Sequence, residues 1–136
     1  MKNMKRILTI LSILGILTSI YLVYSFYNPN SSEFCNISQK ISCEKVTTSK
    51  YAVFLGVPVS ILGIFFFLTS FLLTNSLNKT HNDSIYFLAW NSLGLAFVVY
   101  LIFVEFLLKS ICMWCTLIHI TLLISFILAI RVYKKT

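Results

Sequence analysis

Four cysteines in two pairs are the residues of this sequence best suited to chemistry. Cys112 and Cys115 are separated by two residues, and Cys35 and Cys43 by seven. A two-residue spacing is typical of reversible dithiol chemistry, because the second thiol resolves the mixed disulfide that the first one forms. A structural disulfide at that spacing would close a very short loop and would remove little entropy from the unfolded chain. The spacing therefore favours a redox-active pair.

The composition places most of the chain in a lipid bilayer. Of the 136 residues, 58% are hydrophobic and 11% are charged, whereas soluble domains carry about 25% charged residues. So few charges cannot cover a surface that faces water. The net charge of +7 comes from Lys and Arg residues that lie beside apolar runs, as cations flanking a membrane do. Nucleic acid is therefore not an expected partner.

Four long apolar stretches are each able to cross a bilayer. A spanning helix needs about 20 apolar residues to cross about 30 Å of hydrocarbon at a rise of 1.5 Å per residue. Charged segments and segments rich in Pro, Asn and Ser separate the stretches. The sequence predicts an all-α integral membrane protein, a four-transmembrane-helix bundle in a single domain over residues 1–136. The helices are expected over about residues 7–27, 51–77, 84–108 and 110–132.

The distribution of Lys and Arg predicts how the bundle is oriented. Seven of these cations fall on one side of an even-span protein: Lys2, Lys5, Arg6, Lys79, Arg131, Lys134 and Lys135. Four fall on the other side: Lys40, Lys45, Lys50 and Lys109. Because the more basic side faces the cytoplasm, both termini are expected there, and residues 28–50 form an outer loop. No small-x-small cleavage motif follows the first stretch, so an uncleaved helix is expected rather than a signal peptide.

This topology brings both cysteine pairs to the outer face of the membrane. The outer loop contains Cys35 and Cys43, and the last helix begins at that face with Cys112 and Cys115. The outer side is the oxidising one, where disulfides form and persist. The helix N-terminus and the neighbouring Lys109 both favour a thiolate at the CxxC pair. Dithiol chemistry is therefore expected at this face.

The two thiols of the CxxC pair are expected at different depths. Cys115 lies three residues beyond Cys112, which is about 4.5 Å further into the membrane. Cys112 is thus placed to exchange with a loop cysteine, and Cys115 to face a lipid-soluble acceptor. The chain has no flavin, haem or nucleotide motif. A quinone is therefore the expected acceptor for two electrons that enter through the loop thiols.

The whole chain shares its features with one family. These features are four helices, a Cys-x7-Cys outer loop after the first helix, and a CxxC motif that opens the last helix. Residues 43–49 (CEKVTTS) and 56–63 (GVPVSILG) fit the same pattern. The sequence resembles the vitamin K epoxide reductase (VKOR) family in its short bacterial form. The order of the two pairs separates it from the Dsb-type quinone-coupled oxidases, and without a fused thioredoxin domain the partner is expected to be a separate protein.

The resemblance implies a role for each cysteine. Cys112 and Cys115 are the active-site pair, with Cys115 beside the quinone. Cys35 exchanges with a thioredoxin-like partner, and Cys43 exchanges with Cys112. Bacterial relatives re-oxidise such a partner by reducing menaquinone or ubiquinone, and thereby drive disulfide formation in exported proteins. The resemblance therefore implies a multi-pass protein of the bacterial cytoplasmic membrane.

The resemblance also implies a quinone pocket formed by Ser49, Val59, Gly63, Cys115 and His119. Ser49 stands at a position where the family has Ser or Thr. Animal relatives reduce vitamin K epoxide, and they have a tyrosine at the position of His119 and an asparagine at that of Val59. The missing asparagine argues against epoxide reduction by this chain.

Several of these residues have a second interpretation. His119 lies four residues after Cys115 on one helix face and binds the quinone or forms an interhelical hydrogen bond. Ser49 contacts the quinone or caps the following helix, and Gly63 admits a ring or allows close helix packing. Glu105 forms an ion pair with Lys109 four residues later, or it protonates the reduced quinone.

Aromatic residues near the expected helix ends, Tyr51, Tyr86, Trp90 and Trp114, are expected in the belts at the membrane surface. The run of three phenylalanines at residues 65–67 is expected to contact lipid.

The predicted function is that of a thiol:quinone oxidoreductase. The alternative is a small membrane protein that handles mercury or copper, since soft metals favour thiolate ligands. A carrier would need ligands along its path, whereas all four cysteines are expected at one face, and no Met or His cluster accompanies them. No metal site is therefore expected.

Overall fold

The computed structural model of the chain describes residues 2–27, 53–54, 56–77, 81–109 and 113–135. These residues form four long helices and two short strands: α1 (Lys2–Tyr27), β1 (Val53–Phe54), β2 (Val57–Pro58), α3 (Val59–Ser76), α4 (His81–Leu108) and α5 (Met113–Lys135). All four helices are long and apolar enough to cross a membrane. The prediction of an all-α membrane bundle of four transmembrane helices is confirmed.

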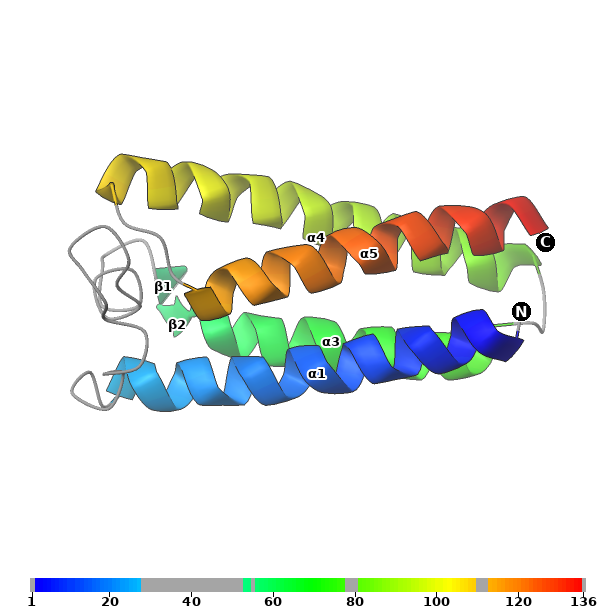
Figure 1. Ribbon diagram of the computed structural model, residues 1–136, viewed down its shortest axis with the longest axis horizontal. Coiled ribbons are helices and arrows are strands. Elements are labelled where there is room, and N and C mark those ends of the chain that lie inside the picture. The colour runs from blue at the N-terminus through cyan, green and yellow to red at the C-terminus, as the bar shows by residue number, and fades with distance from the viewer. Residues whose placement is uncertain (1, 28–52, 55, 78–80, 110–112, 136) are drawn as a thin grey trace.

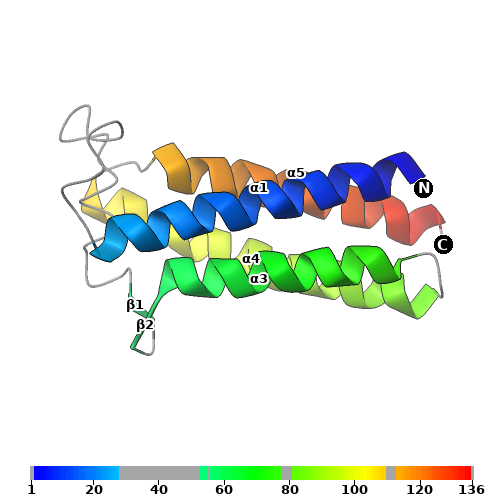
Figure 2. The same ribbon diagram turned by 90° about the horizontal axis from the view of Figure 1, so that it is seen from below.

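The helices form a ring in which each one packs against two neighbours. α1 lies between α3 and α5, and α4 completes the ring by packing against α5 and α3. Both termini lie at one end of the bundle, beside the end of α3 and the start of α4 (Figure 1). The β1–β2 hairpin lies at the opposite end, near the start of α3 (Figure 2). We call these the terminal end and the hairpin end.

The residues before Val59 form a hairpin, so the predicted helix start at residue 51 is wrong. Val53 pairs with Pro58 as β1 runs antiparallel to β2. Gly56 connects the strands with a φ of 80°, a conformation that glycine adopts at little cost. Pro58 has no N–H and disfavours a helical conformation in the residue before it, so the helix begins directly after it. α3 consequently has only 18 residues.

The other helices extend further than predicted, because polar residues continue them beyond the apolar stretches. α1 begins at Lys2 instead of residue 7, α4 begins at His81 instead of residue 84, and α5 continues to Lys135 instead of residue 132. Lys5 Nζ donates a hydrogen bond of 2.9 Å to the carbonyl of Leu77. The cationic first turns of α1 therefore hold the end of α3.

Apolar side chains pack most extensively toward the terminal end. One buried cluster there consists of Leu8, Leu77, Phe87, Leu128, Ala129 and Val132. A second cluster, in the middle of the bundle, joins Phe67, Val98 and Leu122. A third cluster, nearer the hairpin end, is centred on Leu22, with Cys115 among the partly buried side chains packed around it.

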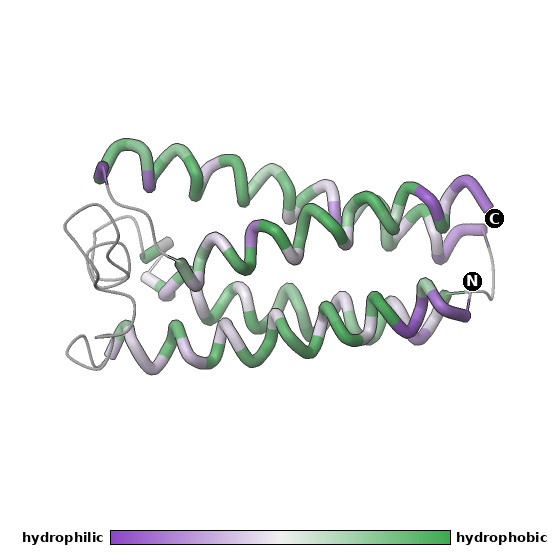
Figure 3. Tube along the Cα trace, in the orientation of Figure 1, coloured by the Kyte–Doolittle hydropathy of each residue, from purple (hydrophilic) through white to green (hydrophobic). Residues whose placement is uncertain are grey.

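Hydrophobic residues predominate along the four helices, and hydrophilic ones gather toward the helix ends (Figure 3). Leu17 is 60% exposed and Phe106 is 80% exposed, as expected of side chains that face lipid. The expectation that residues 65–67 all contact lipid holds only for Phe65, which is 65% exposed. Phe67 is buried, and Phe66 stacks on Trp90 with ring centroids 5.2 Å apart. Two rings of the run therefore pack inside the bundle because the helix turns them inward.

Polar side chains connect helices inside the bundle. Trp90 Nε1 donates hydrogen bonds of 3.2 Å to the carbonyl of Phe66 and to Ser70 Oγ, which joins α4 to α3. Trp90 is therefore an interhelical contact and not the membrane-surface residue that was predicted. Ser125 Oγ donates to Asn91 Oδ1 at 2.8 Å and joins α5 to α4. Such bonds stabilise membrane bundles because lipid offers a buried polar group no other partner.

The contact between α1 and α3 yields a stability prediction. A Cβ atom at Gly15 would lie 2.5 Å from the ring of Phe67. We expect Gly15→Leu to lower the free energy of unfolding by about 1–3 kcal/mol, because overpacking forces the helices apart. Thermal unfolding in detergent micelles measures this change. Ala96→Leu adds the same side chain at an exposed position and should leave the melting temperature unchanged; equal effects would contradict the contact.

Candidate functional site

A cavity of about 390 Å³ lies between the four helices near the hairpin end. Its wall combines the C-terminal half of α1, the N-terminal halves of α3 and α5, and α4 from Trp90 to Glu105. Most of the wall is apolar, with residues such as Leu22, Leu62, Phe66, Phe97, Leu101 and Leu122. Its volume falls within the range of about 300–1,000 Å³ found for small-molecule sites. The site therefore suits an apolar molecule dissolved in the bilayer.

Cys115 lies on this wall, two residues after the first described residue of α5. Its side chain is partly buried and packs against Leu22 of α1. That Cys115 faces a lipid-soluble acceptor remains a prediction. Cys112, Cys35, Cys43 and Ser49 lie outside the described residues, so the contacts expected of them remain predictions.

His119 also lines the cavity, one helical turn deeper than Cys115. Its side chain is 8% exposed, and its Nε2 atom has no hydrogen-bond partner among the described residues. Buried polar groups in proteins almost always have a partner, and an exception asks for an explanation such as a ligand. This orphan atom argues against the interhelical hydrogen bond and favours the ligand-binding interpretation of His119.

Glu105 approaches the same cavity from α4. It is 9% exposed, and its Oε1 atom has no hydrogen-bond partner in the described part of the chain. Glu105 and Lys109, both of which the structure describes, do not form the predicted ion pair. Lys109 follows the last residue of the helix and has a φ of 54°, so the helical spacing that would bring the side chains together is lost. The cavity wall thus contains a buried acid.

Val59 and Gly63, both expected in a quinone pocket, line the α3 side of this cavity. A Cβ atom at Gly63 would lie 2.9 Å from Ser19 Oγ. The glycine therefore allows α1 and α3 to pack closely beside the cavity, which was the second interpretation of this residue. Ser19 is fully buried, lines the cavity, and has no partner for its Oγ atom among the described residues.

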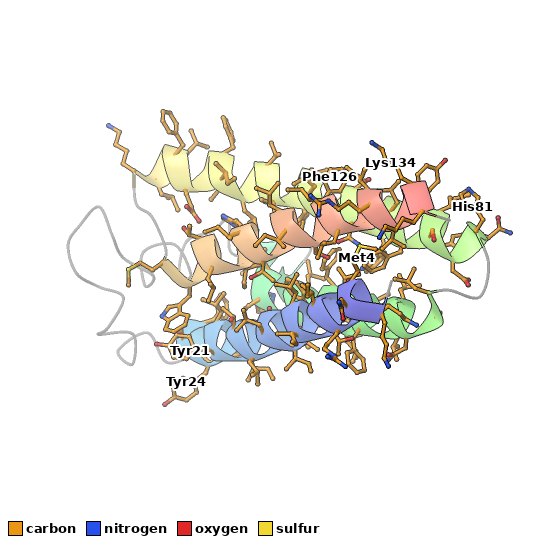
Figure 4. All side chains as sticks on the ribbon, turned by 45° about the vertical axis from the view of Figure 1, so that its right-hand side comes forward. Met4, Tyr21, Tyr24, His81, Phe126 and Lys134 are labelled. Atoms are coloured by element: carbon orange, nitrogen blue, oxygen red, sulfur yellow. The ribbon has the colours of Figure 1, made fainter. Side chains whose placement is uncertain are left out.

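The sequence interpretation missed Ser19, although a signal for it exists. Gly15 and Ser19 are four residues apart, and small residues at that spacing are typical of close contacts between membrane helices. Trp114 was also misplaced, because it was expected at the membrane surface. Its ring packs against Tyr21 with centroids 5.0 Å apart. Tyr21 and Tyr24 lie toward the hairpin end of α1 (Figure 4), so this ring contact ties α5 to α1 beside Cys115.

The sequence matches the model of the Vitamin K epoxide reductase family over residues 6–130. The chain belongs to the vitamin K epoxide reductase family. A search of curated proteins found no match. The matched region includes the whole of α3 and α4, most of α1 and α5, and every residue of the cavity wall, so the predicted resemblance is confirmed.

Membership of the VKOR family establishes the general class of the protein. The family consists of membrane thiol–disulfide oxidoreductases. Its members are in general linked to quinones and work with thioredoxin-like partners. This chain is therefore a multi-pass membrane protein of a redox-enzyme family, and its apolar cavity with a cysteine on the wall is consistent with that class.

The orphan atom of His119 leads to a second stability prediction. We expect His119→Leu to leave the melting temperature unchanged or higher, because it removes a buried polar atom that has no partner. Asn91→Leu is the matched control, because it breaks the bond with Ser125 and should cost about 0.6 kcal/mol, and at most about 1.7 kcal/mol. Thermal unfolding in the same micelles compares the two. Equal destabilisation would indicate that His119 forms a structural hydrogen bond.

Proposed function

We propose that this protein is a membrane thiol:quinone oxidoreductase. It re-oxidises a thioredoxin-like partner and passes the electrons through two cysteine pairs to a quinone. By doing so it drives disulfide formation in exported proteins. The observation that carries the proposal is the position of Cys115 on the wall of an apolar cavity at lipid depth.

The proposed reaction balances in electrons and protons. The reduced partner gives two electrons and two protons to the Cys35–Cys43 disulfide and leaves with a disulfide of its own. Cys43 then exchanges with Cys112, which moves the dithiol state to Cys112 and Cys115. Oxidation of this second pair releases two electrons and two protons, and a quinone takes up both. Each cycle therefore makes one disulfide in the partner and one molecule of quinol.

The cavity residues fit a quinone. A quinone ring is flat and apolar, with two oxygens on opposite edges that accept hydrogen bonds. The apolar wall accommodates the ring, and the orphan Nε2 atom of His119 is available to one oxygen. Cys115 lies one turn away on the same helix. Menaquinone and ubiquinone both satisfy these requirements. The proposed pocket comprises Cys115, His119, Val59 and Gly63, with Ser49 contributed by the outer loop.

The proposed reaction requires the hairpin end of the bundle to face the outside of the bacterial cytoplasmic membrane. Both termini lie at the other end (Figure 1), where Lys2, Lys5 and Arg6 begin α1 and Lys134 and Lys135 end α5. Cations at this end agree with a cytoplasmic location. Cys115, near the hairpin end, is then within reach of thiols on the oxidising side.

The functional prediction concerns Cys115. Purified protein with a reduced thioredoxin-like partner should bleach the absorbance of a soluble short-chain quinone, and Cys115→Ala should abolish this reaction. Without Cys115 the Cys43–Cys112 disulfide cannot be resolved, so it should accumulate. Absorbance measures the quinone, and mass spectrometry after thiol trapping measures the disulfide.

Ile120→Ala is the matched control for this experiment, because Ile120 is 51% exposed on the same helix. It should react at the wild-type rate. Quinone reduction by Cys115→Ala would disprove the proposed path. Recovery of four unoxidised thiols from the wild-type protein, with bound mercury or copper, would instead support the metal-handling alternative.

The orientation yields a separate prediction. In intact cells under reducing conditions, a membrane-impermeant maleimide should label the loop residues Cys35 and Cys43. A single cysteine introduced by Asn82→Cys in a cysteine-free variant should react only after the membrane is permeabilised, because Asn82 is exposed at the terminal end. Labelling of both sites in intact cells would contradict the proposed orientation.

A further inference from the structure

We propose that Glu105 is a catalytic residue of this reaction, the carboxyl group that delivers a proton to one oxygen of the quinone. The proposal rests on the proposed function and adds a residue to it. It assigns the two quinone oxygens to polar groups on two helices: His119 on α5, one turn deeper than Cys115, and Glu105 on α4, nearer the hairpin end.

Glu105 is the only acidic residue on the wall described for this cavity. Its carboxyl group is nine-tenths buried, and Oε1 has no partner among the described residues. Ionisable groups inside membrane bundles normally pair with one another or mark the path of a substrate or proton. Lys109, the nearest cation in the sequence, is exposed beyond the end of α4 and does not pair with it. A structural ion pair therefore does not account for this acid.

The direction of α4 aims Glu105 at the cavity. α4 extends further toward the hairpin end than α5 does (Figure 1), and Glu105 is three residues from the end of α4. Side chains on a helix tilt toward its N-terminus, which for α4 is the direction into the bundle. Glu105 therefore reaches the cavity wall from the hairpin end on α4, while Cys115 and His119 line the same cavity from α5.

The α3 side of the wall offers no second acid. Its polar wall residue is Ser60, whose hydroxyl can donate a hydrogen bond but is far too weak an acid to give up a proton, and Val59 beside it has no donor. His119 can contact one of the two quinone oxygens, which lie on opposite edges of the ring. Among the described wall residues, Glu105 lies on a different helix from His119 and can both donate a hydrogen bond and give up a proton.

The proton transfer closes the balance of the reaction. Oxidation of Cys112 and Cys115 to a disulfide releases two electrons and two protons. The quinone takes up both electrons. Glu105 gives its proton to one quinone oxygen and regains one of the two thiol protons, and the second thiol proton goes to the other oxygen. Its position near the hairpin end also allows exchange with water at the membrane surface. The carboxyl group is therefore unchanged after each cycle.

The test compares four variants of the whole protein with the same reduced partner and a soluble short-chain quinone. Glu105→Gln and Glu105→Met remove the acid and nearly preserve the volume. Glu105→Asp keeps an acid, and Phe106→Leu changes an exposed side chain next to Glu105 on the same helix. We expect the two acid-free variants to lower kcat by on the order of 10²-fold with little change in KM for the quinone. Glu105→Asp should retain more activity than either, and Phe106→Leu should match the wild type.

Two further measurements separate the causes. The rate at which reduced partner exchanges with Cys35 and Cys43 should be the same in all variants, because Glu105 acts only on the quinone step. Melting temperatures identify a variant that does not fold. If one of the two acid-free variants does not fold, the kcat of the other one tests the role of Glu105. A wild-type kcat in a folded acid-free variant would disprove the role of Glu105 and leave the proposed function intact. Equal decreases of kcat in Glu105→Asp and Glu105→Gln would have the same meaning. A wild-type protein that fails to reduce any quinone would refute the proposed function itself.

Discussion

The lack of hydrogen-bond partners in the hydrocarbon of a membrane governs the whole structure. Four helices satisfy the backbone, and hydroxyl groups such as those of Thr9, Thr18 and Thr121 donate to the carbonyl one turn earlier. Five buried polar side-chain atoms of the described residues lack a partner. Those of Ser19, Glu105 and His119 lie on the wall of one cavity. Buried polar atoms without hydrogen-bond partners are thus concentrated at the cavity, where a ligand can bond to them.

Close helix packing surrounds this cavity. Gly15 admits the ring of Phe67, and Gly63 admits Ser19, so α1 and α3 approach each other tightly. Trp90, on the cavity wall, bonds α4 to α3. The terminal end has a buried apolar cluster of its own and the hydrogen bond from Lys5 to Leu77. Cys115 therefore lies in a bundle whose other end is packed independently of the cavity.

The sequence allowed the transmembrane spans and their order to be predicted, because the length and apolarity of each stretch decide them. It also allowed the redox class to be predicted, because the spacing of the cysteines indicates it. It did not reveal the start of α3, because Pro58 and Gly56 override an apolar stretch that reads as helix. It placed Trp90 and Trp114 at the membrane surface, since periodicity alone does not show which ring turns inward. Glu105 was ambiguous, because an i,i+4 spacing implies an ion pair only while the helix continues as far as Lys109.

The 18 residues of α3 span about 27 Å, which is less than the roughly 30 Å of an average hydrocarbon layer. A helix shorter than the layer is accommodated by local thinning of the lipid around it. The leaflet beside the hairpin is therefore expected to dip toward the cavity. Such a dimple would shorten the distance that protons and an external thiol travel to reach the cysteine on α5, while the longer α4 keeps full-thickness lipid on the other side.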